Sequence, residues 1–335
     1  MKRTAEFVSP KHPDKICDRI SDKILDYCLS IDPDSRVAVE TMGGHGFISI
    51  NGEVSINTEK ELPINDLVKE VVGDDYRIQV KIAQQSSEIA RGVDIGGAGD
   101  QGIMTGFACR ENDEFVPQEY YLARSLCRYV YDVFPYDGKT QVTIDENSNI
   151  FAVVCSFQNA PYEQLRNLVY EWIENQGTNP ASVGIYCNPA GDWQQGGFDS
   201  DAGLTGRKLV VDNYGPRVPI GGGAYSGKDP SKVDRSGAYM ARYIAIDQMK
   251  NGGIGDEVYC QLSYGIGMKS PIQAVVSSEL GEWDVSNDYD LSPQGIIKLL
   301  DLKSPIYYQT SQWGAYGNGF NWDKGESNDW TKFKN

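Results

Sequence analysis

Residues 220–236 of the 335-residue chain read IGGGAYSGKDPSKVDRS. The part from Gly222 to Lys228 almost matches the phosphate-binding loop G-x-x-x-x-G-K-[ST], but Asp229 stands where that motif requires serine or threonine. The preceding segment, DNYGPRVPI, contains two prolines, so it does not read as the buried strand that precedes such a loop. The stretch is therefore not predicted to be the P-loop of an NTPase or kinase.

Asp229 and Pro230 together are typical of a helix start, with an N-cap acceptor followed by proline at the first helical position. This would place Lys228 just before the helix and Lys232 in its first turn. Free N–H groups at the helix start favour an anion, and the glycines allow close backbone approach. A flexible loop before a capped helix would explain the same letters, so the stretch alone leaves both interpretations open.

The charge around this stretch has the opposite sign to that of the whole chain. The net charge is −16, whereas residues 207–242 hold seven basic and three acidic residues. The overall charge excludes a general nucleic-acid binder. Because salt screens charges beyond about 8 Å, a local cationic cluster can still bind an anionic substrate. A solvated basic face would give the same local composition.

The numbers and spacing of cysteines and histidines indicate the cellular compartment of the protein and the kind of metal ion that it could bind. The seven cysteines form no C-x-x-C pair, which favours free buried thiols in the cytoplasm. With only His12 and His45 present, we expect any metal to have oxygen ligands, which suits Mg²⁺ or a monovalent cation. No apolar run reaches about 18 residues, and the N-terminus lacks the apolar part of a secretory signal, so no membrane association is expected.

Hydrophobic periodicity predicts an α+β protein in which helices pack on mixed or antiparallel sheets. Helices are expected at 13–29, 63–72, 117–133, 161–175, 231–250 and 292–300. Strands are expected at 36–42, 46–56, 77–83, 102–109, 140–145, 150–157, 182–187, 207–212, 257–267 and 271–278. The order of elements is similar in three successive blocks. The Asp137–Gly138 pair is typical of a hairpin turn, and the polar tail from Asn318 is expected to be loosely ordered.

Three further motifs carry chemistry but are weak when taken singly. His12-Pro13-Asp14-Lys15 begins a helix and could bind a metal–phosphate group, although a solvated helix cap has the same residues. The turn GAGDQG at 97–102 precedes a strand. Trp193, in a polar loop, either covers the core or stacks on a nucleobase.

Taken in order along the chain, these segments resemble the methionine adenosyltransferase (S-adenosylmethionine synthetase) family. The resemblance runs from about Val8 to Gly317 through HPDKICDRISDKILD, VAVET, GAGDQGIMTGFA, DGKTQVT, GLTGRKLVVDNYG and GGGAYSGKDPSKVDRSGAYMARY. It implies three βαββαβ repeats, at residues 1–95, 96–196 and 197–335, with structural domains that need not be continuous in sequence. It also implies a homodimer with active sites at the subunit interface, often paired into a tetramer.

The resemblance implies an enzyme of S-adenosylmethionine biosynthesis and one-carbon metabolism. The methionine sulfur would attack C5′ of ATP in an SN2 step, and the expelled tripolyphosphate would be cleaved to pyrophosphate and phosphate. A neutral thioether needs no general base, whereas a leaving group of about four negative charges calls for preorganised cations. Two Mg²⁺ ions per site and K⁺ are the implied cofactors. A non-catalytic nucleotide-binding homologue that acts as a regulatory subunit is the alternative.

The resemblance also implies roles for individual residues. The implied catalytic residues are His12, Lys139, Arg207, Lys228 and Lys232. The implied ATP-binding residues are His12, Asp137, Lys139, Trp193, Asp201, Arg207, Lys208, Ala224 and Lys228. The implied methionine-binding residues are Glu53, Arg91, Asp100, Asp201 and Lys232. The implied metal ligands are Asp14 and Asp234 for Mg²⁺ and Glu40 for K⁺.

The chain departs from the family pattern mainly near the methionine. Arg91 replaces a glutamine of the gating loop, and the loop from 91 to 97 is shorter. Pro10 and Lys11 stand where the family has Glu-Gly before the HPDK motif. Substitutions near the adenine and before the glycine run are Asp192 for arginine, Trp193 for phenylalanine, and Pro219 and Ile220 for Arg-His. These departures predict altered methionine binding, with the phosphate and metal residues kept.

Overall fold

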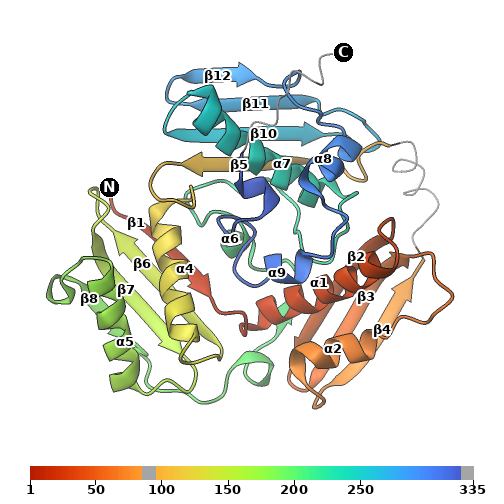
Figure 1. Ribbon diagram of the computed structural model, residues 1–335. Helices are drawn as coiled ribbons and strands as arrows, with labels where there is room; N and C mark the ends of the chain where they lie inside the picture. Colours follow the sequence, from red (N-terminus) through yellow and green to blue (C-terminus); the bar gives the residue numbers. More distant parts are fainter. Residues whose placement is uncertain (85–95, 326–335) are drawn as a thin grey trace.

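The computed structural model describes residues 1–84 and 96–325 and contains three four-stranded sheets with helices packed on them (Figure 1). The predicted α+β class is thereby confirmed. The strand orders are β4-β3-β2-β9, β1-β6-β7-β8 and β12-β11-β10-β5. Each sheet has one face under helices, as the alternation of buried and exposed residues along the strands requires.

The first sheet packs against the helix whose start forms part of the candidate site. Its strands are β2 (Arg36–Gly44), β3 (Phe47–Ser55), β4 (Arg77–Ala83) and β9 (Gly203–Leu204). β2 is antiparallel to β3 and β9, and β3 is parallel to β4. The buried side chains Val37 and Val39 alternate with exposed ones along β2, and helices α1 (Pro13–Ile31) and α2 (Ile64–Val72) cover the apolar face.

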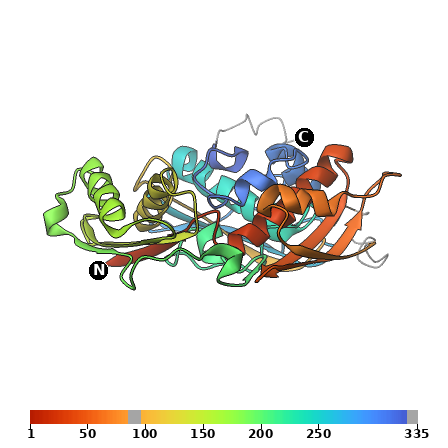
Figure 2. The ribbon, with the colours of Figure 1, turned by 90° about the horizontal axis from the view of Figure 1, so that it is seen from below.

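The other two sheets repeat this arrangement of strands under helices. The second contains β1 (Arg3–Val8), β6 (Gly138–Ile144), β7 (Ile150–Phe157) and β8 (Gly184–Cys187), covered by α4 (Gln118–Tyr131) and α5 (Tyr162–Asn175). The third contains β5 (Gly102–Cys109), β10 (Glu257–Tyr264), β11 (Gln273–Ser278) and β12 (Gly281–Asp284), packed with α7 (Val233–Asp247) and α8 (Pro293–Leu300). Figure 2 shows the helices on one side of the molecule and the sheets on the other.

Strands far apart in sequence pair in every sheet. β1 pairs with β6, β5 with β10, and β9 with β2 at Met42 and Leu204. The sheets thus combine strands from different members of the predicted segments 1–95, 96–196 and 197–335. That division of the chain stays a prediction, and the pairings bring loops from both ends of the sequence to the centre of the molecule.

Three local predictions were wrong. Residues 207–212 do not form a strand: β9 ends at Leu204, and Leu209–Asp212 form the short helix α6, because Asp212 is held by the buried ammonium of Lys15. Asp137–Gly138 is not a hairpin turn, since it joins α4 to β6. Of the tail expected to be loosely ordered, Asn318–Gly325 are ordered after the short helix α9 (Tyr307–Thr310), with a 3₁₀ turn at Asn321–Asp323 and the buried Trp322 ring stacked on Tyr239. The remainder of that prediction, residues 326–335, lies outside the described residues.

The seven cysteines are all buried and free, as predicted. Among the helices of the described residues, none is both long enough and apolar enough to cross a membrane.

Candidate active site

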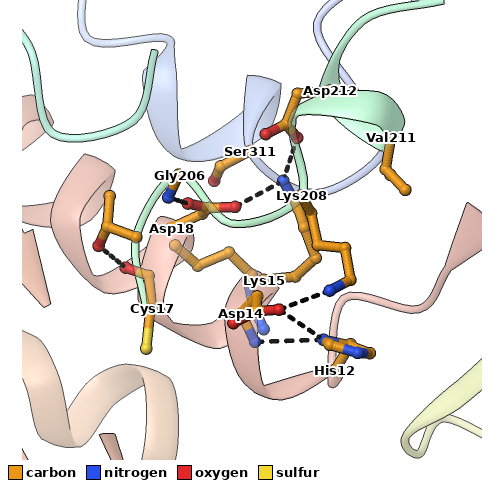
Figure 3. A network of polar contacts seen from close by, with 12 residues as sticks. His12, Asp14, Lys15, Cys17, Asp18, Gly206, Lys208, Val211, Asp212 and Ser311 are labelled. Atoms are coloured by element: carbon orange, nitrogen blue, oxygen red, sulfur yellow. Dashed lines mark hydrogen bonds and ion pairs between the residues drawn. The ribbon is translucent and has the colours of Figure 1, made fainter. Parts of the chain in front are cut away.

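His12 is the N-cap of α1, and its imidazole has a fixed orientation. Its Nδ1 accepts a hydrogen bond from the backbone N–H of Asp14 at 3.2 Å, while Pro13 occupies the first helical position (Figure 3). Burial, and after it the charge of Lys208, lowers the pKa of His12 to about 4. The ring is therefore neutral at pH 7, and because Nδ1 is an acceptor the proton resides on Nε2.

Asp14 gathers the cations of a second segment around the start of α1. Its Oδ2 accepts from Lys208 Nζ at 2.6 Å, and its Oδ1 accepts from the backbone N–H of Leu204 at 3.0 Å. Arg207 Nε lies 3.4 Å from Oδ1, and the Arg207 side chain is 55% exposed. Burial would raise the pKa of Asp14, but the hydrogen bonds from Lys208 and Leu204 outweigh it and lower the pKa. The carboxylate is thus ionised and fixed in place.

The glycine-rich stretch brings a further cation beside this cluster. Lys228 Nζ donates to Asp234 Oδ2 at 2.6 Å, and the backbone of Gly223 passes so close to that carboxylate that an added Cβ would lie 2.2 Å from Asp234 Cγ. A Cβ on Gly206 would lie 2.5 Å from that of Ala224. The turn that carries Arg207 and Lys208 therefore packs against the loop that carries Lys228.

Asp229 does not cap a helix, contrary to the prediction from the Asp-Pro pair. α7 begins at Val233 and its N-cap is Lys232. Asp229 instead accepts from the N–H of Ser231 at 2.9 Å and from the N–H of Val37 at 2.7 Å, and its carboxylate also contacts the ammonium of Lys232. The turn is thereby tied to β2, and Lys232 is buried in an ion pair whereas Lys228 is one-quarter exposed.

Other implied ATP-binding residues lie around the start of α1 with different partners. Lys139 on β6 pairs with Glu6 at 2.8 Å, and the charges of both Lys139 and Asp201 act on the pKa of His12. Asp137 accepts from the N–H of Gly197 at 2.9 Å, and burial raises its pKa. Trp193 packs against Gly196, where a Cβ would meet its ring at 2.7 Å.

The implied methionine and potassium residues lie on the sheets and in one turn. Glu53 on β3 is opposite Ala38 of β2, and Ala38 forms an isolated bridge with Lys228, so Glu53 lies near the lysine loop. Glu40 is exposed on β2, opposite Asn51. Asp100 is exposed and accepts from the N–H of Gln101. Arg91 lies outside the described residues.

A row of aspartates on α1 was not predicted from the sequence. Asp14, Asp18, Asp22 and Asp26 recur every four residues, so they share one face of the helix. We call them the aspartate row. Each accepts backbone N–H groups from distant segments, at Leu204, Gly206, Gly227, Tyr307 and Tyr308. The spacing D-x-x-x-D-x-x-x-D-x-x-x-D could have revealed this row in the sequence. It was not recognised because acidic residues at helical spacing usually face solvent.

Two fully buried cations balance the middle of this row. Lys15 Nζ lies 3.0 Å from Asp18 Oδ2 and 2.5 Å from Asp212 Oδ1, so two carboxylates share one ammonium (Figure 3). Burial, together with the charge of Asp212, raises the pKa of Asp18 to about 7 despite the opposing effect of Lys15. Arg235 binds Asp22 through both of its terminal nitrogens, each at 2.8 Å.

The carboxylates fit hard cations that a polyphosphate helps to bind. Within residues 1–84 and 96–325, no three His, Cys, Asp or Glu side chains form a group that could hold a metal. Mg²⁺ is commonly bound by one or two carboxylates together with substrate phosphates rather than by an all-protein cage. Asp14 and Asp234, each now paired with a lysine, are donors of this kind.

Fold and site together define an α+β protein in which Arg207 and Lys208 contact the capped start of one helix and the loop that bears Lys228 packs beside them, an arrangement suited to a polyphosphate ligand. Comparison with known proteins is more specific. The N-terminal, central and C-terminal domain models of S-adenosylmethionine synthetase match residues 1–94, 95–193 and 195–324. The chain belongs to the S-adenosylmethionine synthetase family, which confirms the resemblance.

Individual relatives match over nearly the whole chain. The S-adenosylmethionine synthase of a Nitratiruptor species is 39% identical, with 97% of this chain and 96% of the relative covered. That of Sulfurimonas denitrificans is 40% identical, covering 96% and 93%. That of Parvibaculum lavamentivorans is 41% identical, covering 96% and 95%. Each match thus covers nearly all of both proteins.

Proposed function

We propose that the protein is an ATP:L-methionine S-adenosyltransferase. The observation that carries the proposal is the contact of Arg207 and Lys208 with ionised Asp14 at the start of α1, beside neutral His12, with the loop that bears Lys228 packed against their turn. Their amino and guanidinium groups are held on carboxylates that a substrate can replace. Such a set of cations can stabilise the negative charge of a leaving group as it departs.

In the proposed reaction the methionine sulfur donates its lone pair to C5′ of ATP, the C5′–O bond breaks, and the bond electrons leave with tripolyphosphate. One water molecule then hydrolyses the tripolyphosphate to pyrophosphate and orthophosphate. No residue needs to remove a proton from the thioether. The cations instead stabilise charge that grows on the leaving oxygen, which is most effective when they are already in place. Neutral His12, with its proton on Nε2, offers one further hydrogen-bond donor without adding charge.

Asp14 and Asp234 would hold Mg²⁺ together with the phosphates, and Glu40 would hold K⁺. When bound, Mg²⁺ supplies positive charge at the phosphate oxygens. We assign the adenine to the neighbourhood of Trp193, and the remaining phosphate contacts to Lys139. Glu53, Asp100 and Asp201 are assigned to methionine, as is Lys232 once it leaves Asp229. Arg91 belongs to the same proposal from sequence alone.

We further propose that the chain acts as a homodimer, with pairing into tetramers as an extension. Apolar side chains lie exposed on the sheets, at Met42, Phe47, Ile103 and Leu204, where helices do not cover them. Exposed apolar groups on a sheet face favour association. The site loops around Leu204 reach the same face, so a second subunit docked there would lie beside the site.

The test is a steady-state assay with ATP, L-methionine, Mg²⁺ and K⁺, in which S-adenosylmethionine is measured by chromatography. We expect product only when both substrates are present. Tight nucleotide binding without product would favour the regulatory homologue instead, and would contradict the proposed function.

A further inference from the structure

The aspartate row connects α1 to the loops that bear the cations. Asp18 Oδ1 accepts from the N–H of Gly206 at 2.8 Å, and Asp22 Oδ1 accepts from the N–H of Gly227 at 2.8 Å. Gly206 directly precedes Arg207 and Lys208, and Gly227 directly precedes Lys228. Each carboxylate therefore holds the peptide unit next to a cation of the proposed phosphate site.

The two glycine turns have little freedom apart from these hydrogen bonds. Gly206 and Gly227 have φ angles of 77° and 80°, a region that favours glycine. A Cβ on Gly227 would lie 1.9 Å from the carbonyl oxygen of Val39. The close packing leaves each turn one backbone conformation, and the carboxylate oxygen that accepts from its N–H helps to set where that turn lies. A shift of this oxygen would therefore move the N–H and, with it, the residue that follows.

Asp18 and Asp22 act on the site only through these turns. Both side chains are 0% exposed, so neither carboxylate can touch a substrate. Their charges face buried cations of the protein itself, Lys15 and Arg235. Each carboxylate is thus held between a backbone N–H and a buried cation of the protein, as expected of a preorganised support and not of a ligand-binding group.

We propose that Asp18 and Asp22 are positioning residues, which set the place of the two cation-bearing turns relative to His12 and Asp14. This inference rests on the proposed function, since it assigns those cations to the triphosphate. Ser21 extends the same support, because its Oγ lies 2.8 Å from the hydroxyl of Thr205, in the residue before Gly206.

Asp26 supplies an internal control. It belongs to the same row and accepts two backbone N–H bonds at 2.9 Å, from Tyr307 and Tyr308. The segment that it holds carries none of the cations assigned to the triphosphate. Removal of Asp26 should therefore lower stability without moving the site, whereas removal of Asp18 should do both.

The experiment compares Asp18→Ala, Asp18→Glu and Asp26→Ala in the full chain. Steady-state constants for ATP and methionine are measured, with the dissociation constant of inorganic tripolyphosphate in Mg²⁺ by calorimetry and the melting temperature of each variant. For Asp18→Ala we expect the KM for ATP and the tripolyphosphate constant to rise about tenfold, equivalent to about 1.4 kcal/mol. The KM for methionine should change less than about twofold, and Asp26→Ala should leave all three constants near those of the parent.

Asp18→Glu separates positioning from charge and covers the case in which the alanine variant does not fold. Glutamate keeps a carboxyl group beside Lys15 but moves the acceptor by one methylene, so the ATP constant should still rise. Parent-like ATP and tripolyphosphate constants in Asp18→Glu, or an equal rise in Asp26→Ala, would overturn the inference. A parent protein that makes no S-adenosylmethionine would instead refute the proposed function, while the tripolyphosphate constants would still compare the variants.

Discussion

Replacing Lys228 with methionine tests the role of the glycine-rich stretch most sharply. Methionine keeps much of the side-chain volume and removes the charge. Lys228 Nζ lies 2.6 Å from Asp234 Oδ2, and their side chains are 25% and 8% exposed. The substitution therefore leaves a largely buried carboxylate without its cation.

Two magnitudes follow from this geometry. A hydrogen bond to a charged group contributes about 1.5–3 kcal/mol, and partial exposure of Lys228 reduces this, so the free energy of unfolding should fall by about 1–2 kcal/mol. In the transition state a unit charge about 4 Å from a developing charge contributes about 4 kcal/mol at an effective dielectric constant near 20. Since Lys228 must first leave Asp234, a net loss of about 3 kcal/mol is expected, or about a hundredfold in kcat/KM.

The assay is S-adenosylmethionine formation for the parent, Lys228→Met and the double variant Lys228→Met/Asp234→Asn, together with urea unfolding. The double variant should recover stability, because no uncompensated carboxylate remains, but not activity. Lys298→Met, at an exposed position of α8, is the matched control and should change neither quantity. A kcat/KM for Lys228→Met within about threefold of the parent would refute the assignment of this lysine to the leaving group.

Three further outcomes are expected. Asp14→Asn keeps an acceptor for the N–H of Leu204 but removes the charge that holds Lys208, so turnover should fall at least about a hundredfold while the circular dichroism spectrum is retained; turnover near that of the parent would contradict the metal and phosphate roles. The pKa of His12 is lowered to about 4, so its contribution to stability is fully present above the unfolded pKa near 6.5 and is lost as the pH falls toward 4. Between pH 7 and pH 5 the free energy of unfolding, measured by urea titration, should fall by about 2 kcal/mol more in the parent than in His12→Gln. Equal losses in the two proteins would show that the imidazole is not buried in its neutral form. Trp193→Ala should raise the KM for ATP about fivefold, from a lost stacking contribution of about 1 kcal/mol, and Trp193→Phe less than twofold; equal constants in the two variants would place the ring away from the adenine.

Local signals in the sequence predicted most helices and strands. Pro13 and the apolar spacing that follows it define α1, and the observed helix ends at Ile31, two residues beyond the predicted end at Leu29. β10 and β11 were expected at 257–267 and 271–278, and lie at Glu257–Tyr264 and Gln273–Ser278. Such elements are predictable because neighbouring residues determine their periodicity.

Features that depend on distant contacts could not be predicted in this way. β1, whose partner β6 lies more than a hundred residues away, was missed because its short run RTAEFV has too few apolar residues to define an alternation. The apolar run Leu209–Val211 reads as a strand by propensity, yet the buried contact between Asp212 and Lys15 holds the segment as a helix turn.

The candidate site was predicted as a set of residues but not as a geometry. The order of the motifs along the chain predicted that His12, Asp14, Lys208 and Lys228 belong to one site. The structure adds the carboxylates with which the two lysines pair. The roles of Asp18 and Asp22 stayed hidden, since a buried acidic residue is recognised only once its hydrogen-bond donors are placed. Asp229 was misassigned for the same reason, because its acceptor serves β2 and not the helix.

We propose that the cations around the start of α1 serve the expulsion of intact tripolyphosphate by methionine. The decisive measurement is the product balance in one reaction mixture with ATP, L-methionine, Mg²⁺ and K⁺. We expect equal amounts of S-adenosylmethionine, pyrophosphate and orthophosphate, with ATP consumed only when methionine is present. Release of ADP and orthophosphate at a rate that does not depend on methionine would contradict this proposal.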